Sequence, residues 1–170
     1  MSRSATLQRG KILVPAILLV LVGALVASLF MATPRKPPAP LGASAGVTGG
    51  LARINGVIPA EADGGMPAAA SAALASPPAE GLHRVRLLVE LTALEEGGLA
   101  YDPSGYSVSG LGAGMWKALW FSPAPAGVPQ GQSINATLVF ELPDRAIDLT
   151  LELPGGPGLS LGAAHHRGRG

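Results

Sequence analysis

The sequence predicts an all-β fold, an antiparallel β-sandwich built from short strands. Two observations lead to this class. In the C-terminal half, apolar and polar residues alternate with a period of two, which places one set in a core and the other in water. Pro- and Gly-rich turns separate these segments, and residues 51–153 contain no convincing helical pattern. The segment 51–153 has the length of one small domain.

Residues 131–153 carry the clearest strand pattern. Ile134 to Leu142 alternates inward and outward positions, and after Pro143-Asp144 the alternation resumes from Ile147 to Leu153. We expect two antiparallel strands that pair with each other and cover a core. The expected inward residues are Ile134, Ala136, Leu138, Phe140, Leu142, Ile147, Leu149, Leu151 and Leu153.

Four further segments are expected to contribute to the sandwich. Residues 82–94 form a second clear strand, in which Leu88 interrupts the polar face and predicts that part of this face is covered. Residues 51–58 form a strand with a turn or bulge at Asn55-Gly56. Residues 106–109 form a short strand, and 115–121 is compatible with a strand or a helical turn.

An apolar segment, Ile12 to Ala32, precedes this domain and contains no charged residue. About 20 such residues suffice for a helix to cross a bilayer. A cleaved signal peptide is the alternative, with Val26-Ala27-Ser28 as its cleavage site, but the apolar run continues beyond this point. We therefore expect a transmembrane anchor at 12–32, with residues 1–11 in the cytoplasm and the C-terminal domain outside the cell membrane.

Three segments are expected to lack regular structure. Residues 33–50 are rich in Pro and then Gly, which predicts a tether. Residues 60–79 form an Ala/Pro/Gly-rich insert that we expect to be a disordered loop within the domain. Residues 154–170 show no strand pattern and are expected to be a flexible tail.

The composition excludes several classes of function. The chain has no cysteine, which excludes disulfides, thiolate metal sites, cysteine nucleophiles and a lipid-modified cysteine. All eleven acidic residues lie within 51–153, together with five basic residues, so the domain has a net charge of −6. Phosphate binding needs a cationic face, and we therefore expect no nucleic-acid partner.

No catalytic site is evident. Gly105 to Ser109 approaches a nucleophile-elbow motif, with Ser107 or Ser109 as the nucleophile, but Ser109 replaces the final glycine and no convincing helix follows. The three histidines, His83, His165 and His166, lie at a strand start or in the tail. We expect a protein that is not an enzyme and has no catalytic residue.

Three other motifs have a plainer structural interpretation. Gly110 to Gly114 could cradle a phosphate only under a helix N-terminus, so a flexible hairpin loop is expected. Asn135-Ala136-Thr137 matches a glycosylation triplet, but Asn135 is expected to be an outward strand residue. Met66, His83 and the His165-His166 pair could bind copper only if several ligands converged, so no metal or cofactor is assigned.

Trp116 and Trp120 are the candidate partner-binding residues. They share a face if 115–121 is a strand, and they are also neighbours in a helical turn. Two tryptophans flanked by Gly- and Pro-rich loops either fill the core or mark a surface that a partner covers.

Residues 51–153 resemble a family of bacterial extracytoplasmic domains of unknown function, whose immunoglobulin-like sandwich is related in fold to a secreted mycobacterial immunoprotective antigen. The resemblance depends on Val128 to Ile134, Thr137 to Pro143 and Leu149 to Leu151, and also on Arg84 to Ala93 and Tyr101 to Tyr106. It implies an immunoglobulin-like β-sandwich behind a membrane anchor and a tether, and it supplies no catalytic residues.

These observations lead to two hypotheses about function. The first is a membrane-tethered extracytoplasmic module, held by residues 12–32, that binds an unknown envelope protein or ligand without catalysis. The second is an extracytoplasmic copper-binding module.

Overall fold

The computed structural model describes residues 18, 20–23, 36–60, 74–111 and 114–163 of the chain. The chain divides into two compact units, Met1–Arg35 and Lys36–Gly170. In the first unit, the described residues Leu18 and Val20–Gly23 are helical. No helix among the described residues is long and apolar enough to cross a membrane. Most of the predicted anchor, and all of the predicted cytoplasmic segment 1–11, lie outside the described residues.

The second unit is built almost entirely from antiparallel strands, which confirms the all-β prediction. The strands are β1 (Ser44–Val47), β2 (Gly50–Pro59), β3 (Leu82–Ala93), β4 (Leu99–Tyr101), β5 (Ser107–Ser109), β6 (Met115–Lys117), β7 (Trp120–Ser122), β8 (Ala126–Val128), β9 (Ser133–Pro143), β10 (Thr150–Glu152) and β11 (Leu159–Ser160). A short 3₁₀ turn, Pro103–Gly105, lies between β4 and β5.

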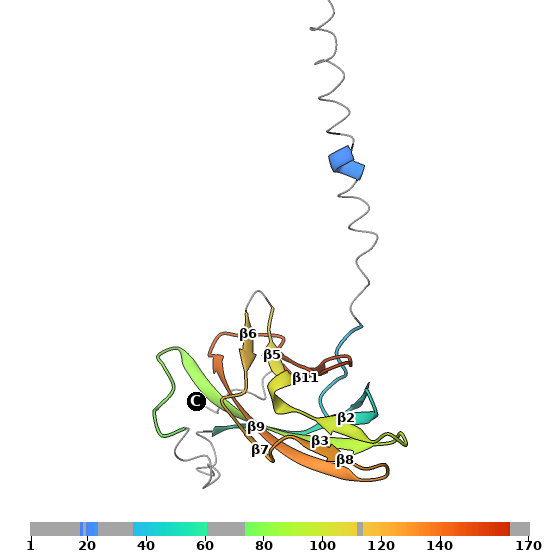
Figure 1. Cartoon of the computed structure of the whole chain (residues 1–170). Helices are drawn as coiled ribbons and strands as arrows, with labels where there is room; N and C mark the ends of the chain where they lie inside the picture. Colours follow the sequence, from blue (N-terminus) through green and yellow to red (C-terminus); the bar gives the residue numbers. More distant parts are fainter. Residues whose placement is uncertain (1–17, 19, 24–35, 61–73, 112–113, 164–170) are drawn as a thin grey trace, which may run out of the picture. The chain divides into compact units, whose positions relative to one another are not determined.

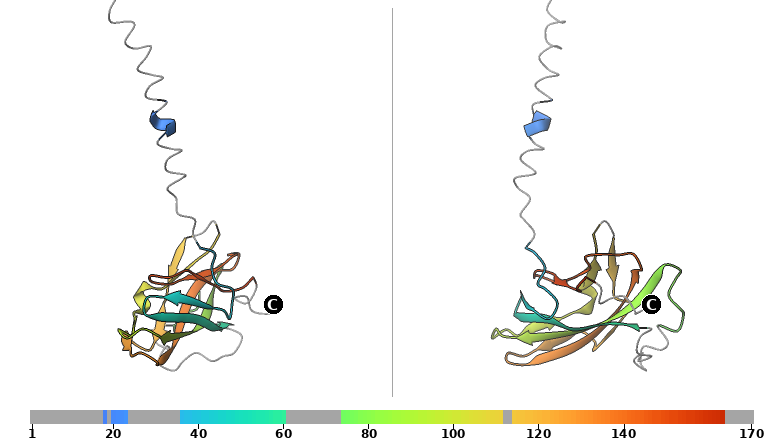
Figure 2. Two further views of the ribbon diagram at one scale, coloured as in Figure 1. Left: turned by 90° about the vertical axis from the view of Figure 1, so that its right-hand side faces the viewer. Right: turned by 180° about the vertical axis from the view of Figure 1, so that it is seen from behind.

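These strands form two main sheets over a common core. The larger sheet has the order β1-β2-β3-β9-β7, the smaller has the order β11-β10-β5-β6, and β4 and β8 pair separately. Figures 1 and 2 show the long strands β2, β3 and β9 together as one curved layer, with the short strands β5, β6 and β11 in the other layer. Buried side chains from both sheets, such as Leu87, Phe140, Val108 and Leu151, belong to one hydrophobic cluster.

The centre of the larger sheet is the β3–β9 pair. Its register runs without interruption from Leu82 opposite Pro143 to Thr92 opposite Ser133. The predicted inward residues of β9 are buried except for Ile134, which is half-buried, and Phe140 is completely inaccessible to solvent. The alternation also predicts five inward residues in β3, all of which are buried: Val85, Leu87, Val89, Leu91 and Ala93. Along β2, the register with β3 shifts between Ile54 and Gly56, which confirms the predicted irregularity there.

The predicted pairing within 131–153 was wrong, although both strands exist. β9 pairs with β3 and β7, whereas β10 pairs with β5 and β11 in the other sheet. The link between them therefore crosses from one sheet to the other. Ile147 was expected to face the core, but it lies in this link and is 48% exposed, so that prediction was wrong. A period of two shows which side chains face the core but does not show which strands pair. β9 and β10 face the same core from the two opposite sheets, so both have the alternation although they do not pair.

The structure also differs from the prediction at both ends of the domain. Residues 33–50 were expected to be only a tether, but β1 lies within them and pairs with β2 through a Thr48-Gly49 turn. Residues 154–170 were expected to be a flexible tail, but β11 pairs with β10, and Leu159 and Leu161 are buried in the core. Each segment is ordered because its inward apolar side chains, Ala45 in one and Leu159 and Leu161 in the other, pack into the core.

One end of the outward face of the larger sheet is covered, as the position of Leu88 predicted. Val139 points outward from β9 and yet has no solvent exposure, because it packs with Leu74 and with the half-buried Trp120. Arg84 of β3 is 6% exposed on this side, where its Nη1 donates a hydrogen bond to the carbonyl oxygen of Leu74 at 2.8 Å. Its Nε donates to Glu141 Oε2 at 3.1 Å.

Leu74 belongs to the segment 60–79, which was expected to be a disordered insert. Residues 61–73 lie outside the described residues, but Leu74 is buried against the sheet, so at least this part of the prediction was wrong. The apolar contact with Val139 and the hydrogen bond from Arg84 hold it there.

Candidate functional site

The first candidate residue, Trp116, belongs to the smaller sheet. Trp116 of β6 lies opposite Val108 of β5, which in turn lies opposite Leu151 of β10. Val108 and Leu151 are buried, so this row faces the core, and Trp116 is a half-buried edge residue packed against it. The ring of Trp116 therefore packs at the edge of the core and is partly exposed to solvent.

The second candidate, Trp120, belongs to the larger sheet. It lies opposite Val139 on the outward face and packs against Val139 and Leu74. The structure therefore assigns Trp116 and Trp120 to different sheets and different apolar clusters, so it does not bring the two rings together on one strand face. Both rings remain half-buried.

The exposed apolar surface near these tryptophans is formed by their neighbours. We name four side chains the apolar strip: Leu111, Met115, Leu119 and Phe121, which are 68%, 69%, 49% and 38% exposed. Leu111 follows β5, Met115 begins β6, Leu119 links β6 to β7, and Phe121 lies in β7. The link β6–β7 crosses between the two sheets, so the strip extends from the β5–β6 hairpin of the smaller sheet to the edge strand β7 of the larger sheet.

Sequence reasoning selected the tryptophans because they are the largest apolar residues in the segment. The alternation alone does not mark the strip. Met115 faces away from the core on β6, whereas Phe121 lies opposite the buried Leu138 and is exposed because β7 is an edge strand. Ile147 adds to this surface, because its carbonyl oxygen accepts a hydrogen bond from the Leu111 amide at 3.2 Å and its side chain is exposed.

The candidate nucleophiles make contacts that do not resemble a catalytic arrangement. Ser107 Oγ is 3.4 Å from Met115 Sδ, and Ser109 Oγ donates to Glu152 Oε1 at 2.6 Å. His83 lies on β3 in the other sheet, where its Nδ1 is 2.9 Å from Asp144 Oδ1. Each serine therefore has a partner other than His83.

The remaining sequence motifs have these places in the structure. Gly110 and Gly114 flank the β5–β6 hairpin connection, which confirms the hairpin, while residues 112 and 113 lie outside the described part. Asn135 is an exposed outward residue of β9, as expected. Met66, His165 and His166 lie outside the described residues, and the part of the chain that is described contains no group of three or more His, Asp or Glu that could hold a metal ion.

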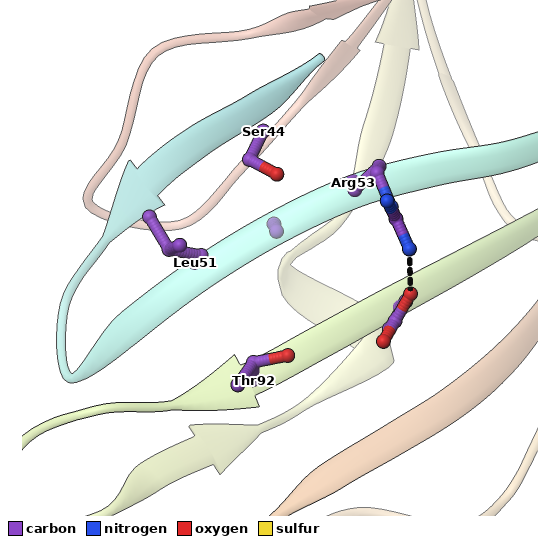
Figure 3. Close-up of a pocket in the computed structure, with 6 residues that line it drawn as sticks. Ser44, Leu51, Arg53 and Thr92 are labelled. Atoms are coloured by element: carbon purple, nitrogen blue, oxygen red, sulfur yellow. Dashed lines mark hydrogen bonds and ion pairs between the residues drawn. The ribbon is translucent and has the colours of Figure 1, made fainter. Parts of the chain in front are cut away.

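The open end of the outward face of the larger sheet has a shallow pocket of about 200 Å³ (Figure 3). Ser44, Leu51, Arg53 and Thr92 surround it on β1, β2 and β3. Arg53 Nη2 donates to Glu90 Oε2 at 2.6 Å, and the amide of Asn55 donates to the same oxygen at 3.0 Å. The hydrogen bonds from Asn55 and from Arg53 lower the pKa of Glu90, so the pocket is lined by an ion pair whose charges already neutralise each other.

The fold and these surfaces define an all-β domain of antiparallel sheets with one shared core. Comparison of the chain with protein-family models, with curated proteins and with solved structures gave no match.

Proposed function

We propose that this protein is a membrane-anchored, non-catalytic binding module of the cell envelope, and that the apolar strip is its partner-binding surface. The observation that supports this proposal is that four large apolar side chains within eleven residues are each at least 38% exposed: Leu111, Met115, Leu119 and Phe121. Single exposed apolar residues are ordinary on a protein surface, and four of them within one short segment support a surface that a partner covers.

The location is supported by the sequence. Ile12 to Ala32 has the apolar length of a transmembrane helix, and basic residues are in excess on its N-terminal side. The domain is then extracytoplasmic. Resistance of the full chain to carbonate extraction of membranes tests this proposal, and a mature N-terminus near Leu29 would contradict it.

An immunoglobulin-like topology is our proposal for the domain. Two antiparallel sheets that share one core, with the links β6–β7 and β9–β10 crossing between them, support it. The absence of catalysis is also a proposal. Its support is that Ser107, Ser109 and His83 have separate partners, and covalent labelling of either serine by a fluorophosphonate probe would contradict it.

The binding experiment compares two substitutions of equal chemistry and similar exposure. Leu119 in the strip is 49% exposed, and Leu94, which directly follows β3, is 52% exposed. The full chain carrying Leu119→Asp, Leu94→Asp or no change is cross-linked in its native membrane, purified, and scored for covalent partners. We expect Leu119→Asp to lose the cross-linked partner and Leu94→Asp to retain it, with unchanged melting temperatures for both.

The tryptophans provide the complementary test. Trp116 and Trp120 are half-buried and pack against apolar clusters, so alanine at either position should lower the melting temperature by several degrees. If Leu119→Asp retains the partner, or if a tryptophan substitution removes it without lowering the melting temperature, the strip is not the binding surface.

A further inference from the structure

A cavity of about 430 Å³ lies at the end of the domain where three turns meet, away from the residues of the apolar strip. Its lining comes from Val47-Thr48, Leu91, Gly97 to Ala100, Tyr106 and Pro154-Gly155. Leu91, Leu99 and Tyr106 are each less than 5% exposed. A volume of this size falls in the range of pockets that bind small molecules, which are mostly apolar with a few polar groups.

Glycine residues shape the walls of this cavity. Gly98 has a φ of +69°, and a Cβ there would lie 2.5 Å from the carbonyl oxygen of Val128. Gly155 has a φ of +68°, and a Cβ there would lie 2.6 Å from Thr48 Oγ1. Side chains are therefore excluded where the turns approach one another, and backbone forms much of the wall. Gly97 differs, since a Cβ there would meet nothing within 4 Å.

Two buried tyrosines, Tyr101 and Tyr106, pack against each other beside this cavity. Tyr106 lines the cavity, and the ring of Tyr101 packs against it with a centroid separation of 5.9 Å. Burial raises the pKa of each hydroxyl to about 12, so both are uncharged at physiological pH. The hydroxyl of Tyr101 is buried without a hydrogen-bond partner among the described residues. Tyr101 itself does not line the cavity, so it contributes to the site only through its contact with Tyr106.

The negative charge beside the cavity comes from one turn. None of the lining residues is charged. Glu95 and Glu96 are exposed in the turn directly before Gly97. Hydrogen bonds from the Ser104 side chain and backbone lower the pKa of Asp102, so this carboxylate is ionised, but Lys117 Nζ donates to the Ser104 carbonyl oxygen at 3.0 Å and offsets its charge. Glu95 and Glu96 therefore repel an anionic ligand and attract a cation.

We propose that this cavity is a binding site for a small apolar molecule that carries one ammonium group. Its apolar body packs against Leu91, Leu99 and Pro154, and its ammonium group lies toward Glu95 and Glu96 at the rim. This site is independent of the apolar strip and does not depend on the partner-binding proposal.

The test uses the full chain in phosphatidylcholine nanodiscs and three probes of matched size: 2-phenylethylammonium, 2-phenylethanol and 3-phenylpropionate. Binding is measured by saturation-transfer NMR, with empty nanodiscs as the blank. We expect the ammonium probe to bind at least tenfold more tightly than the carboxylate and severalfold more tightly than the alcohol. Equal binding of the ammonium and carboxylate probes, or no binding above the blank, would overturn the proposal.

Two sets of variants place the binding in the cavity. Gly97→Leu introduces a side chain into open space at the wall and should reduce ammonium binding at least tenfold. Gly114→Leu is the matched control, because a Cβ at Gly114 also meets nothing within 4 Å and Gly114 does not line the cavity. The double variant Glu95→Gln/Glu96→Gln alters only exposed side chains and should remove the preference for ammonium over alcohol. Unchanged affinity in Gly97→Leu, or an unchanged preference in the double variant, would refute the site.

Discussion

Replacing Val139 by threonine tests the covered end of the outward sheet face. Val139 has no solvent exposure, although it faces away from the main core, because Leu74 and Trp120 pack over it. Threonine keeps the shape and β propensity of valine but replaces a methyl group with a hydroxyl. The reverse change, Thr137→Val, is the matched control, since Thr137 lies two residues earlier on the same face of β9 and is half-exposed.

The expected magnitude follows from burial. Removing one buried methyl group costs about 0.8 kcal/mol, and burying a hydroxyl with an incomplete set of hydrogen bonds costs about 1–3 kcal/mol. We therefore expect Val139→Thr to lower the free energy of unfolding by about 2–4 kcal/mol. Thr137→Val should change it by no more than about 0.5 kcal/mol, as is usual for surface positions.

Urea unfolding followed by the fluorescence of the two tryptophans measures both variants. With a denaturant dependence of about 1–3 kcal/mol per molar urea, Val139→Thr should lower the midpoint by roughly 1 M without changing the slope. If both substitutions leave the midpoint unchanged, residues 74 and 120 do not cover this end of the sheet, and the account of the covered face is wrong.

Two further predictions concern the core and the tyrosine pair. Phe140→Ala should lower the free energy of unfolding by about 3–5 kcal/mol, because the ring is completely buried. Phe121→Ala should lower it by only about 1–2 kcal/mol, because that ring is 38% exposed at the sheet edge. Calorimetry on both variants measures the two losses, and equal losses would contradict the assigned burial. The pKa values of Tyr101 and Tyr106 are raised to about 12 by burial, so the unfolded state loses their protons first as the pH rises. The stability contributed by these two tyrosines should therefore be constant below about pH 10 and be lost between about pH 10 and 12, by about 2–3 kcal/mol per tyrosine. A double Tyr→Phe variant that shows the same fall in this range would contradict the assignment.

The inward faces of the long strands could be predicted because burial imposes a period of two on the sequence. Leu87, Leu138 and Phe140 illustrate this, since each is inward in the pattern and fully buried in the structure. The neighbour of each strand could not be predicted in this way. The alternation in β9 is equally compatible with pairing to β10 or to β3, and the choice depends on long-range contacts that no local pattern contains.

The short edge strands were missed for a different reason. β1 and β11 contain four and two residues and lie in segments dominated by Gly and Pro. Such composition predicts a linker, because few side chains are available for burial. Here Ala45 and Leu159 are buried because β1 pairs with β2 and β11 pairs with β10.

Partner binding by the segment around Trp116 and Trp120 stays a prediction. The exposed apolar side chains of this segment are Leu111, Met115, Leu119 and Phe121, whereas the tryptophans are half-buried. Sequence alone could not show which of the alternating positions face outward, because the segment passes from one sheet to the other between Lys117 and Trp120. The cavity beside Tyr106 gives no sequence signal, since it is formed by turns that are far apart along the chain.

The β3–β9 pairing also determines how the domain can fold. Its partners are separated by about 41 residues at one end and 61 at the other, and the smaller sheet is encoded largely within and after this interval. The chain must therefore close a long loop before the central pair gains any stability, which predicts slow folding relative to helical proteins of this length. During synthesis from the N-terminus, the apolar face of β3 stays without its main partner until β9 has emerged. In that interval the nascent chain depends on β2, the only adjacent strand of the sheet already made, to cover one edge of β3.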